Sequence, residues 1–228
     1  MKDILSSLLS SLLFLITMQT SFSQEKIYSY LALGDSYTIG ESVSEAMKWP
    51  VQLVSRLNNA GYGFKIADPK IIATTGWTTQ ELKAAILEEK PAKDYDFVSL
   101  LIGVNNQYRK YPLDDYPSEF ESLLKIAIEH AGGHKHKVIV VSIPDYGFTP
   151  FGKSKQPIIS KGIDDYNMIN QRITKDYGIK YYSITSISRN GLKDAGLIAN
   201  DKLHPSGKQY SLWVDLILED EALVRIFN

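Results

Sequence analysis

The chain has 228 residues, of which 44% are hydrophobic and 22% are charged, with a formal net charge of −1 and no cysteine. This length and apolar content predict one folded domain with a sizeable core and exclude a disordered chain. The near-zero net charge provides no general attraction to nucleic acid or to an anionic membrane surface, and the lack of cysteine excludes disulfides, thiol catalysis and thiolate metal sites.

The N-terminal segment differs from the rest of the chain. Residues 4–18 form an uncharged run rich in Leu, Ile and Ser. The run is shorter than the roughly 20 residues that cross a membrane, but it fits the apolar core of a signal peptide. Small residues up to Ser23 predict cleavage there, so residues 1–23 are interpreted as a signal peptide and 24–228 as the mature domain. We therefore expect a secreted or periplasmic protein without stable membrane insertion; the alternative is an amphipathic helix packed on the domain.

Apolar runs alternate with helical patterns along the rest of the chain. Strands are expected at 27–33, 64–74, 96–102, 138–143 and 179–184. Helices are expected at 49–60, 79–89, 117–130, 163–177 and 206–218. The longest irregular stretch, 145–160, is rich in Pro, Gly and aromatic residues and follows the fourth strand. This alternation predicts an α/β fold in which right-handed crossovers build a parallel sheet with helices on both faces.

A candidate nucleophile follows the first predicted strand. In Gly34-Asp35-Ser36, the glycine ends the apolar run and the serine lies at the carboxyl end of the strand, where open α/β sheets bind their ligands. A serine hydroxyl becomes a nucleophile only beside a base and donors that stabilise an oxyanion. The alternative is that Ser36 caps a helix.

A candidate base lies near the C-terminus. Pro205 disfavours a helical backbone at His204, so the imidazole is expected on a loop that can turn toward the sheet. Asp201, three residues earlier, can reach the other ring nitrogen, fix the tautomer and stabilise the imidazolium that forms during reaction. The alternative is a surface histidine beside an aspartate that caps a turn.

Two further strand ends carry candidate oxyanion donors. Gly76 follows the second predicted strand and Asn105 follows the third. The backbone N–H groups of Ser36 and Gly76 and the side-chain amide of Asn105 could hold a developing oxyanion. Gly76 and Asn105 are each also compatible with a simple role in a turn.

Four blocks occur in a characteristic order: Gly34-Asp35-Ser36, Gly76, Gly103-Val104-Asn105 and Asp201-x-x-His204. Together they resemble the SGNH hydrolases, the GDSL-type esterase and lipase family, over nearly all of the chain after the signal segment. The resemblance implies a flavodoxin-like three-layer α/β/α sandwich with a five-stranded parallel sheet. It also implies ester hydrolysis by a Ser-His-Asp triad.

The chain departs from the family pattern at two positions. Tyr37 follows the serine where Leu is usual, and Asn106 stands where Asp is usual. Neither departure removes a group that the mechanism needs, but both are expected to alter the pocket. Candidate substrate-binding residues are Asp35, Trp77, Tyr146 and Phe148. Aromatic residues considered beside them are Phe151, Tyr108, Tyr111 and Tyr116.

The remaining histidines do not predict a metal site. His130, His134 and His136 flank the glycine pair at the end of a predicted helix, where cations are favoured. They lack a clear ligand geometry with supporting acids. We expect no metal and no other cofactor.

The sequence thus predicts an exported serine esterase that hydrolyses carboxylic esters through an acyl-enzyme. O-acetyl or short acyl groups on carbohydrate are the leading substrates, because no long apolar stretch resembles a lipase lid. A lysophospholipase or other lipid-ester hydrolase is the alternative, and a non-catalytic carbohydrate- or peptidoglycan-binding protein is the alternative of another class. The expected partner is a small-molecule or glycan ester rather than nucleic acid, and the oligomeric state is not predicted.

Overall fold

The computed structural model describes residues 26–227, so the predicted signal peptide lies outside the described residues. A parallel sheet with the strand order β4-β2-β5-β6-β7 forms the middle of the molecule. Its strands are β2 (Tyr30–Gly34), β4 (Lys70–Ala73), β5 (Phe97–Leu101), β6 (Val138–Val141) and β7 (Lys180–Tyr182). The predicted flavodoxin-like fold with five parallel strands is confirmed.

The central strands are buried on both faces. Every residue of β2, β5 and β6 is buried, which explains why these segments read as continuous apolar runs rather than as alternating patterns. The register pairs Gly34 with Ala73 on one side and with Leu101 on the other. Three strands therefore end close together, and the loops that follow them meet at one edge of the sheet.

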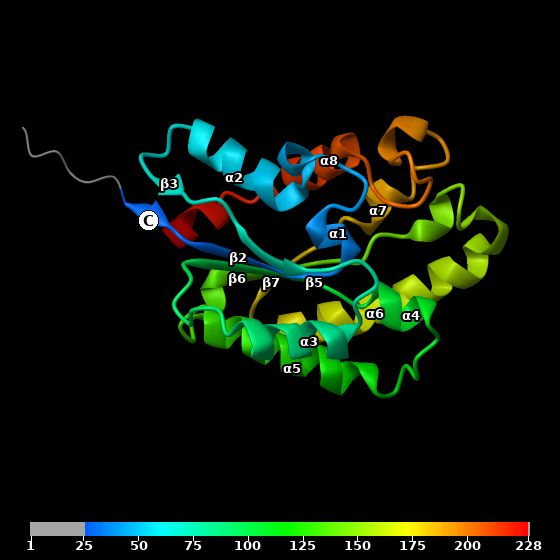
Figure 1. Cartoon of the computed structure of the whole chain (residues 1–228), viewed down its shortest axis with the longest axis horizontal. Helices are drawn as coiled ribbons and strands as arrows, with labels where there is room; N and C mark the ends of the chain where they lie inside the picture. The colour runs from blue at the N-terminus through cyan, green and yellow to red at the C-terminus, as the bar shows by residue number, and fades with distance from the viewer. Residues whose placement is uncertain (1–25, 228) are drawn as a thin grey trace, which may run out of the picture.

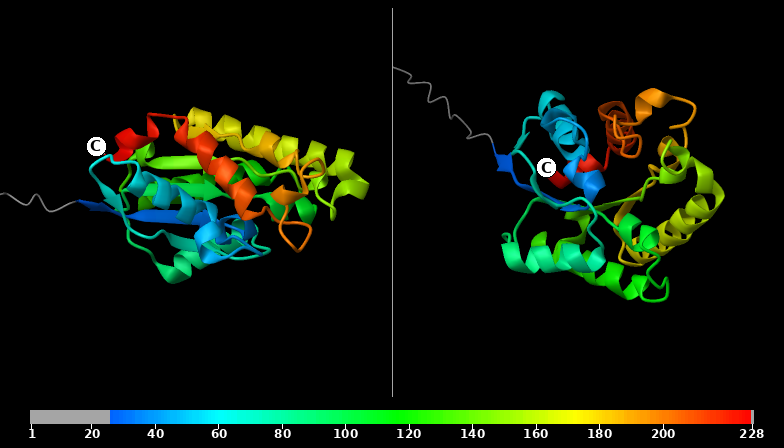
Figure 2. Two further views of the ribbon diagram at one scale, coloured as in Figure 1. Left: turned by 90° about the horizontal axis from the view of Figure 1, so that it is seen from above. Right: turned by 45° about the vertical axis from the view of Figure 1, so that its right-hand side comes forward.

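Long helices cover both faces of the sheet (Figures 1 and 2). One layer holds α2 (Trp49–Asn59) and α8 (Gly207–Leu218), which pack against each other with Trp49 and Trp213 fully buried. The other layer holds α3 (Thr79–Glu89), α5 (Tyr116–His130) and α6 (Gln156–Asp176). No helix within residues 26–227 is long and apolar enough to cross a membrane.

Short elements complete the fold. Strands β1 (Ile27–Tyr28) and β3 (Lys65–Ile66) pair separately from the main sheet. The short α-helices are α1 (Ser36–Ile39), α4 (Val104–Tyr108) and α7 (Thr185–Ser188). The 3-10 helices are η1 (Glu45–Met47), η2 (Lys135–Lys137), η3 (Tyr146–Phe148), η4 (Lys153–Lys155), η5 (Ala195–Leu197) and η6 (Leu223–Phe227).

Three expected elements differ from the sequence-based expectation. The strand expected at 27–33 is divided into β1, which pairs with β3, and β2, which belongs to the main sheet. The strand expected at 64–74 is divided into β3 and β4, and Pro69, which has no N–H for a ladder, lies in the break. The helix expected from residue 163 begins at Gln156, with Pro157 in its first turn, where a missing N–H costs nothing. The stretch 145–160 is therefore mostly short helical turns rather than irregular chain.

Two glycines shape the strand ends that lead into the site. A Cβ at Gly34 would lie 2.2 Å from the Thr38 hydroxyl and 2.6 Å from the Leu101 carbonyl oxygen, and Gly34 does not have a positive φ. The fold therefore requires the small size of Gly34 and not the backbone freedom of a glycine. Gly103 has a φ of 122°, and a Cβ there would lie 2.2 Å from the Tyr116 hydroxyl. Gly103 thus needs both conformational freedom and space.

Candidate active site

Ser36 is the first residue of α1 and is separated from the end of β2 by Asp35 alone. Asp35, not Ser36, caps this helix, because its carboxylate accepts a hydrogen bond from the Tyr37 N–H at 3.0 Å. Because Asp35 caps the helix, the Ser36 hydroxyl is not used as a helix cap. Ser36 is 4% exposed and lines a pocket at the carboxyl edge of the sheet.

Asp35 is an unusual cap, because its carboxylate is completely buried. Its Oδ2 atom has no hydrogen-bond partner among the described residues. Burial raises the pKa of Asp35 to about 7, although the hydrogen bond from Tyr37 opposes that rise. Asp35 supports the Ser36 turn from inside the protein and does not line the pocket.

His204 and Asp201 form an oriented pair on the loop before α8. The imidazole Nδ1 lies 2.6 Å from the Asp201 Oδ2 atom. Asp201 also accepts the backbone N–H groups of Leu203 and His204, each at 2.9 Å, and the Ser42 hydroxyl at 2.7 Å. This arrangement turns the Nε2 side of the ring away from Asp201.

The Asp201 carboxylate is ionised at neutral pH. Burial alone would raise its pKa, but the hydrogen bonds from the side chain and backbone of His204, from Leu203 and from Ser42 together lower the pKa to about 2. A fixed negative charge beside Nδ1 favours a proton on that nitrogen and leaves Nε2 as the acceptor.

Asn105 reaches the same pocket from α4, the short helix after β5. Its side-chain amide donates to the Trp77 carbonyl oxygen at 2.9 Å. A primary amide has two N–H donors, and this bond uses one of them. The Asn105 amide is therefore fixed in orientation and keeps a second donor.

The neighbouring Asn106 is buried and does not line the pocket. It accepts the Thr79 N–H at 3.1 Å and donates to the Thr79 hydroxyl at 2.7 Å and to the Glu119 carboxylate at 3.1 Å. Asn106 thus holds the loop after β5 against the start of α3 and against α5, rather than forming part of the pocket wall.

Gly76 lies on the loop between β4 and α3 with a φ of +88°. Arg109, the residue that ends α4, donates to the Gly76 carbonyl oxygen at 2.6 Å and to Glu81 at 3.2 Å. Glu81 in turn closes a capping box with Thr78 at the start of α3. This chain of contacts joins the Gly76 loop to the Asn105 helix.

The pocket has a volume of about 260 Å³ and brings together residues from distant parts of the chain. Its walls are Ser36, Tyr37, Val104, Asn105, Tyr108, Tyr146, Phe151, Leu203 and His204. Of the predicted residues, Ser36, Asn105, His204 and Tyr146 line it, and Asp201 contacts it through His204. No hydrogen bond joins the side chains of Ser36 and His204 among residues 26–227. Figure 1 shows the segments that carry these residues gathered at one end of the sheet.

Other predicted residues lie outside this pocket. The pocket is not lined by Trp77, Phe148 or Gly76. Trp77 is linked to it indirectly, because its backbone carbonyl oxygen accepts the hydrogen bond that orients the Asn105 side chain. The Tyr116 ring is buried in the core beneath Gly103.

Three pocket residues were not proposed as substrate contacts from the sequence. Tyr37, Val104 and Leu203 each directly adjoin a proposed site residue in the chain. Their position next to a proposed site residue is the signal in the sequence by which they could have been found. Tyr37, where the family usually has Leu, packs its ring edge against the His204 imidazole with 5.8 Å between the ring centres.

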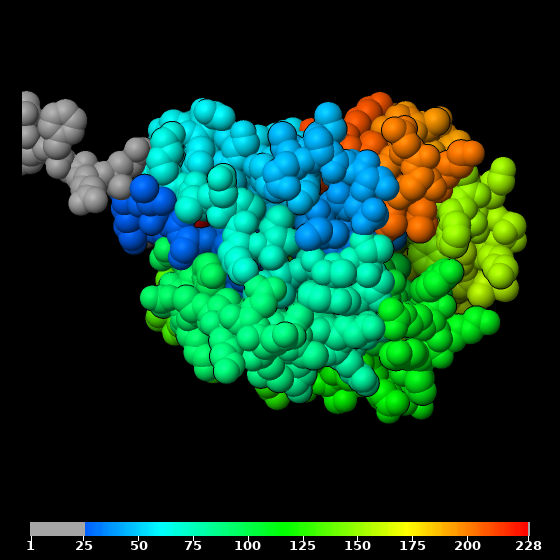
Figure 3. All heavy atoms as spheres, in the orientation of Figure 1, coloured from blue at the N-terminus to red at the C-terminus, as the bar shows by residue number. Residues whose placement is uncertain are grey.

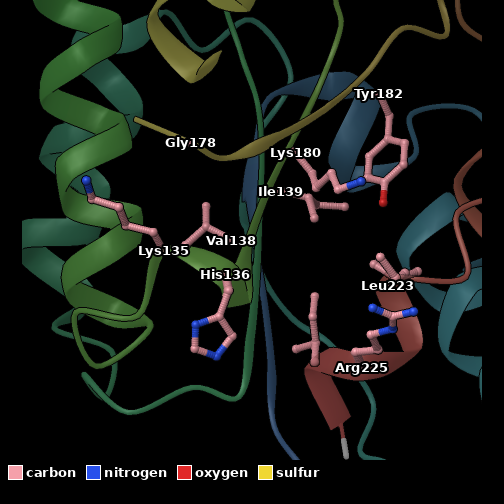
Figure 4. A pocket seen from close by; sticks show the side chains of 11 residues that line it. Lys135, His136, Val138, Ile139, Gly178, Lys180, Tyr182, Leu223 and Arg225 are labelled. Atoms are coloured by element: carbon pink, nitrogen blue, oxygen red, sulfur yellow. The ribbon is translucent and has the colours of Figure 1, made fainter. Parts of the chain in front are cut away.

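A second hollow of about 210 Å³ lies near the amino ends of β6 and β7 (Figure 4). Three cationic side chains, those of Lys135, Lys180 and Arg225, line it with several apolar ones, and two of the three are already engaged. Lys180 pairs with Asp220 at 2.8 Å, and the Lys135 amine, which extends away from the apolar side chains in Figure 4, lies 5.1 Å from the centre of the Tyr177 ring. In the part of the chain that the structure describes, no serine, carboxylate or amide side chain lines this hollow.

Comparison with known proteins identifies the family. The family model of the GDSL-like lipase/acylhydrolases matches residues 32–212, so the chain belongs to this family of hydrolases, which are esterases and lipases. The four blocks identified in the sequence fall inside the matched region. No curated protein matches the chain.

Solved structures share the fold at low sequence identity. The structure of TesA has a TM-score of 0.63 and 16% identity, covering 87% of this chain and 99% of its own. Axe2, an acetylxylan esterase from Geobacillus stearothermophilus, has a TM-score of 0.61 and 20% identity, covering 84% and 93%. A lipase/acylhydrolase from Enterococcus faecalis has a TM-score of 0.63 and 21% identity, covering 86% and 95%.

Proposed function

We propose that the chain is a serine esterase that hydrolyses carboxylic esters through an acyl-enzyme on Ser36. The observation that carries the proposal is the single pocket that joins Ser36 and Asn105 to a histidine oriented by a carboxylate. A hydroxyl, a base and a directed amide donor are the parts that acyl transfer requires. Membership of the esterase and lipase family supports the same reaction.

In the proposed mechanism, His204 Nε2 takes the proton of the Ser36 hydroxyl as Ser36 Oγ bonds to the ester carbonyl carbon. Hydrogen bonds of this kind are commonly loose without substrate and tighten when it binds. Asp201 holds Nδ1–H and stabilises the imidazolium, because its low pKa keeps it ionised. His204 then gives its proton to the leaving alcohol, and a water molecule releases the acid by the reverse sequence.

The negative charge on the carbonyl oxygen needs donors fixed in advance. We propose the free Asn105 amide N–H and the backbone N–H groups of Ser36 and Gly76 for this role. Loss of one such donor from a preorganised site costs about 10²–10³ in kcat. The contact from Arg109 to the Gly76 carbonyl gives a reason for that loop to keep its geometry.

The substrate proposed first is an O-acetyl or other short acyl ester on carbohydrate. A pocket of about 260 Å³ suits a small acyl group, and the rings of Tyr108, Tyr146 and Phe151 suit stacking on a sugar. The fold is shared with an acetylxylan esterase. A lipid ester is the second candidate, because Tyr108 and Phe151 are 55% and 51% exposed and offer apolar surface to an acyl chain.

Covalent labelling separates an esterase from a non-catalytic binding protein. A fluorophosphonate probe is expected to label the wild type at Ser36 and to leave the Ser36→Ala variant unlabelled. A series of para-nitrophenyl esters of increasing acyl length, followed by acetylated polysaccharides, then defines the substrate. A wild type that neither reacts with the probe nor cleaves any ester would contradict the proposal and favour a binding role.

We also propose that the chain is exported, on the basis of the signal-like residues 1–23. A chain that begins at Gln24 is expected to be active but retained inside the producing cell, whereas the full chain is processed and exported. Cell fractionation and N-terminal sequencing of the mature protein test this. Retention of the full chain, or loss of folding on truncation, would contradict it.

A further inference from the structure

A second chamber adjoins the proposed active-site pocket. It has a volume of about 420 Å³ and shares three lining residues with that pocket, namely Tyr108, Tyr146 and Phe151. These three rings, here called the aromatic wall, pack on one another with 6.1–6.4 Å between centres. The aromatic wall therefore separates two connected chambers, with Ser36 and His204 on one side.

The loops that carry the aromatic wall are fixed in place. The Tyr146 hydroxyl donates to Gln107 at 2.9 Å, which joins the 145–155 loop to α4. Asp145 is buried, accepts the Ser160 hydroxyl at 2.6 Å and pairs with Arg189 at 3.0 Å. The chamber is thus a built part of the fold. In Figure 3 the green segment around residue 110 and the yellow-green segment around residue 155 lie side by side at one end of the molecule.

The outer chamber differs from the inner one in charge. Lys110 and Lys155 line it, and no acidic side chain of the described residues does. Both lysines are exposed, and neither has an ion-pair partner within residues 26–227. By contrast, Arg109, next to Lys110 in the chain, is paired with Glu81. The cations that face the chamber are available to a ligand.

The chamber also offers apolar surface beside these charges. Ile158 is 76% exposed and lines it together with the buried Ile159 and the aromatic wall. An apolar floor with two free ammonium groups fits an organic anion better than a neutral chain or an inorganic ion. Carboxylates, like phosphates, are groups that lysine side chains bind by charge-assisted hydrogen bonds.

From these observations we propose that the outer chamber is a subsite for a carboxylate carried by the ester substrate, bound by Lys110 and Lys155. This inference rests on the proposed esterase activity, since it assigns the part of the substrate that extends past the aromatic wall. The carboxylate can belong to the acyl group or to the alcohol, and the two cases are separated by experiment. In either case, hydrolysis at Ser36 is unchanged in chemistry and only the selection of the ester differs.

Matched pairs of esters test the subsite. For the acyl side, mono-para-nitrophenyl adipate is compared with para-nitrophenyl hexanoate. For the alcohol side, para-acetoxybenzoate is compared with its methyl ester. The quantity measured is the ratio of kcat/KM for the anionic ester to that for the neutral ester, in the wild type and in a Lys110→Gln/Lys155→Gln variant. Comparing ratios between proteins removes the intrinsic difference in reactivity between the esters.

The double substitution is expected to lower the ratio roughly three- to tenfold in one of the two pairs, because exposed ion pairs are individually weak. The affected pair shows which side of the ester carries the carboxylate. Raising the salt to about 0.5 M is expected to lower the wild-type ratio in the same pair. Lys175→Gln is the matched control, because Lys175 is an exposed lysine at the far end of α6 and lies outside both chambers.

Two results would overturn the subsite, and they can be told apart. If the wild type cleaves the neutral esters in a Ser36-dependent way but neither ratio responds to the double substitution, the subsite is wrong and the esterase proposal stands. If the wild type shows no Ser36-dependent cleavage of any of the four esters, both proposals fail. An equal fall in the ratio for Lys175→Gln would also overturn the subsite, because the effect would then be one of overall charge.

Discussion

The two ends of the central sheet carry hollows of similar volume, about 260 Å³ at the carboxyl edge and about 210 Å³ near the amino ends of β6 and β7. The first contains Ser36, Asn105 and an imidazole held by Asp201. The second contains cations that are mostly occupied by neighbouring groups, as Lys180 is by Asp220 (Figure 4). Size alone therefore does not distinguish a site from a gap between elements.

The carboxyl edge differs from the opposite end because polar side chains from several loops meet there. Three loops after parallel strands and the loop before α8 bring polar groups with different chemical roles to one place. At the opposite end the charged lining groups are all cations, and among residues 26–227 no serine hydroxyl, carboxylate or side-chain amide lines the hollow. The predictions below test whether this difference is functional.

The largest loss of activity is expected when the Ser36 hydroxyl or the His204 imidazole is removed. Ser36→Ala and His204→Ala should each lower kcat by roughly 10⁴–10⁶-fold, because groups that act as one unit fail together. Arg225→Ala, in the hollow at the amino end, is the control and should leave kcat unchanged. Steady-state kinetics on a para-nitrophenyl ester, with circular dichroism to verify folding, measures this. Comparable losses at both ends would show that the assignment of the site is wrong.

The second effect concerns the oxyanion. Asn105→Ala should lower kcat by about 10²–10³-fold with a smaller change in KM, because a donor used mainly in the transition state is lost. Asn106→Asp should change kcat by less than about tenfold, because Asn106 contacts Thr79 and Glu119 rather than the pocket. Kinetics of the two variants side by side decides this, and a larger loss at Asn106 would mean that the roles are reversed.

The third effect concerns the buried Asp35. Because burial raises the pKa of Asp35 to about 7, well above the ordinary value of an aspartate, the folded protein holds a proton that the unfolded chain has released between about pH 4 and pH 7. Stability is therefore expected to fall as pH rises from about 4 to about 7, by on the order of 2–4 kcal/mol. Asp35→Asn removes this dependence. Chemical denaturation across this pH range measures it, and parallel curves for the two proteins would refute the assignment.

The smallest effect is expected in stability at Asn106. Asn106→Asp replaces an amide that donates to Glu119 with a second carboxylate, so two like charges would meet in a buried place. We expect a loss of about 1–2 kcal/mol in the free energy of unfolding at neutral pH. Adding Glu119→Gln should restore part of it, whereas no recovery would show that the repulsion is not the cause.

Much of the fold could be predicted from the sequence, because a doubly covered parallel sheet leaves a strong signal. The runs in β2, β5 and β6 are apolar without interruption, and the capping box of Thr78 and Glu81 marks the start of α3. The early start of α6 was missed because Gln156 and Pro157 follow a stretch of turn-like composition. Propensity there did not reveal that Pro157 occupies a first turn.

The site was predictable only where residue type and spacing carry chemistry. Asp201 and His204 are three residues apart and hydrogen-bonded, and Asn105 and Ser36 reach the same pocket. Tyr108, Phe151 and Phe148 are all among the aromatic candidates, but the sequence could not show that the first two line the pocket and that Phe148 does not. These positions depend on how the 145–155 loop turns, which is fixed by distant contacts such as that of Asp145 with Arg189.

One backbone contact joins the aromatic wall to the loop that carries the proposed base. The Phe151 N–H donates to the Lys202 carbonyl oxygen at 3.2 Å, and Lys202 lies between Asp201 and His204 in the chain. A redesign that exchanges only the Phe151 ring keeps this bond and can retune specificity alone. Grafting a loop of another length between residues 145 and 155 removes the bond and shifts the imidazole with it. Engineering of this protein should therefore vary the aromatic wall by point substitution and preserve the length of the 145–155 loop.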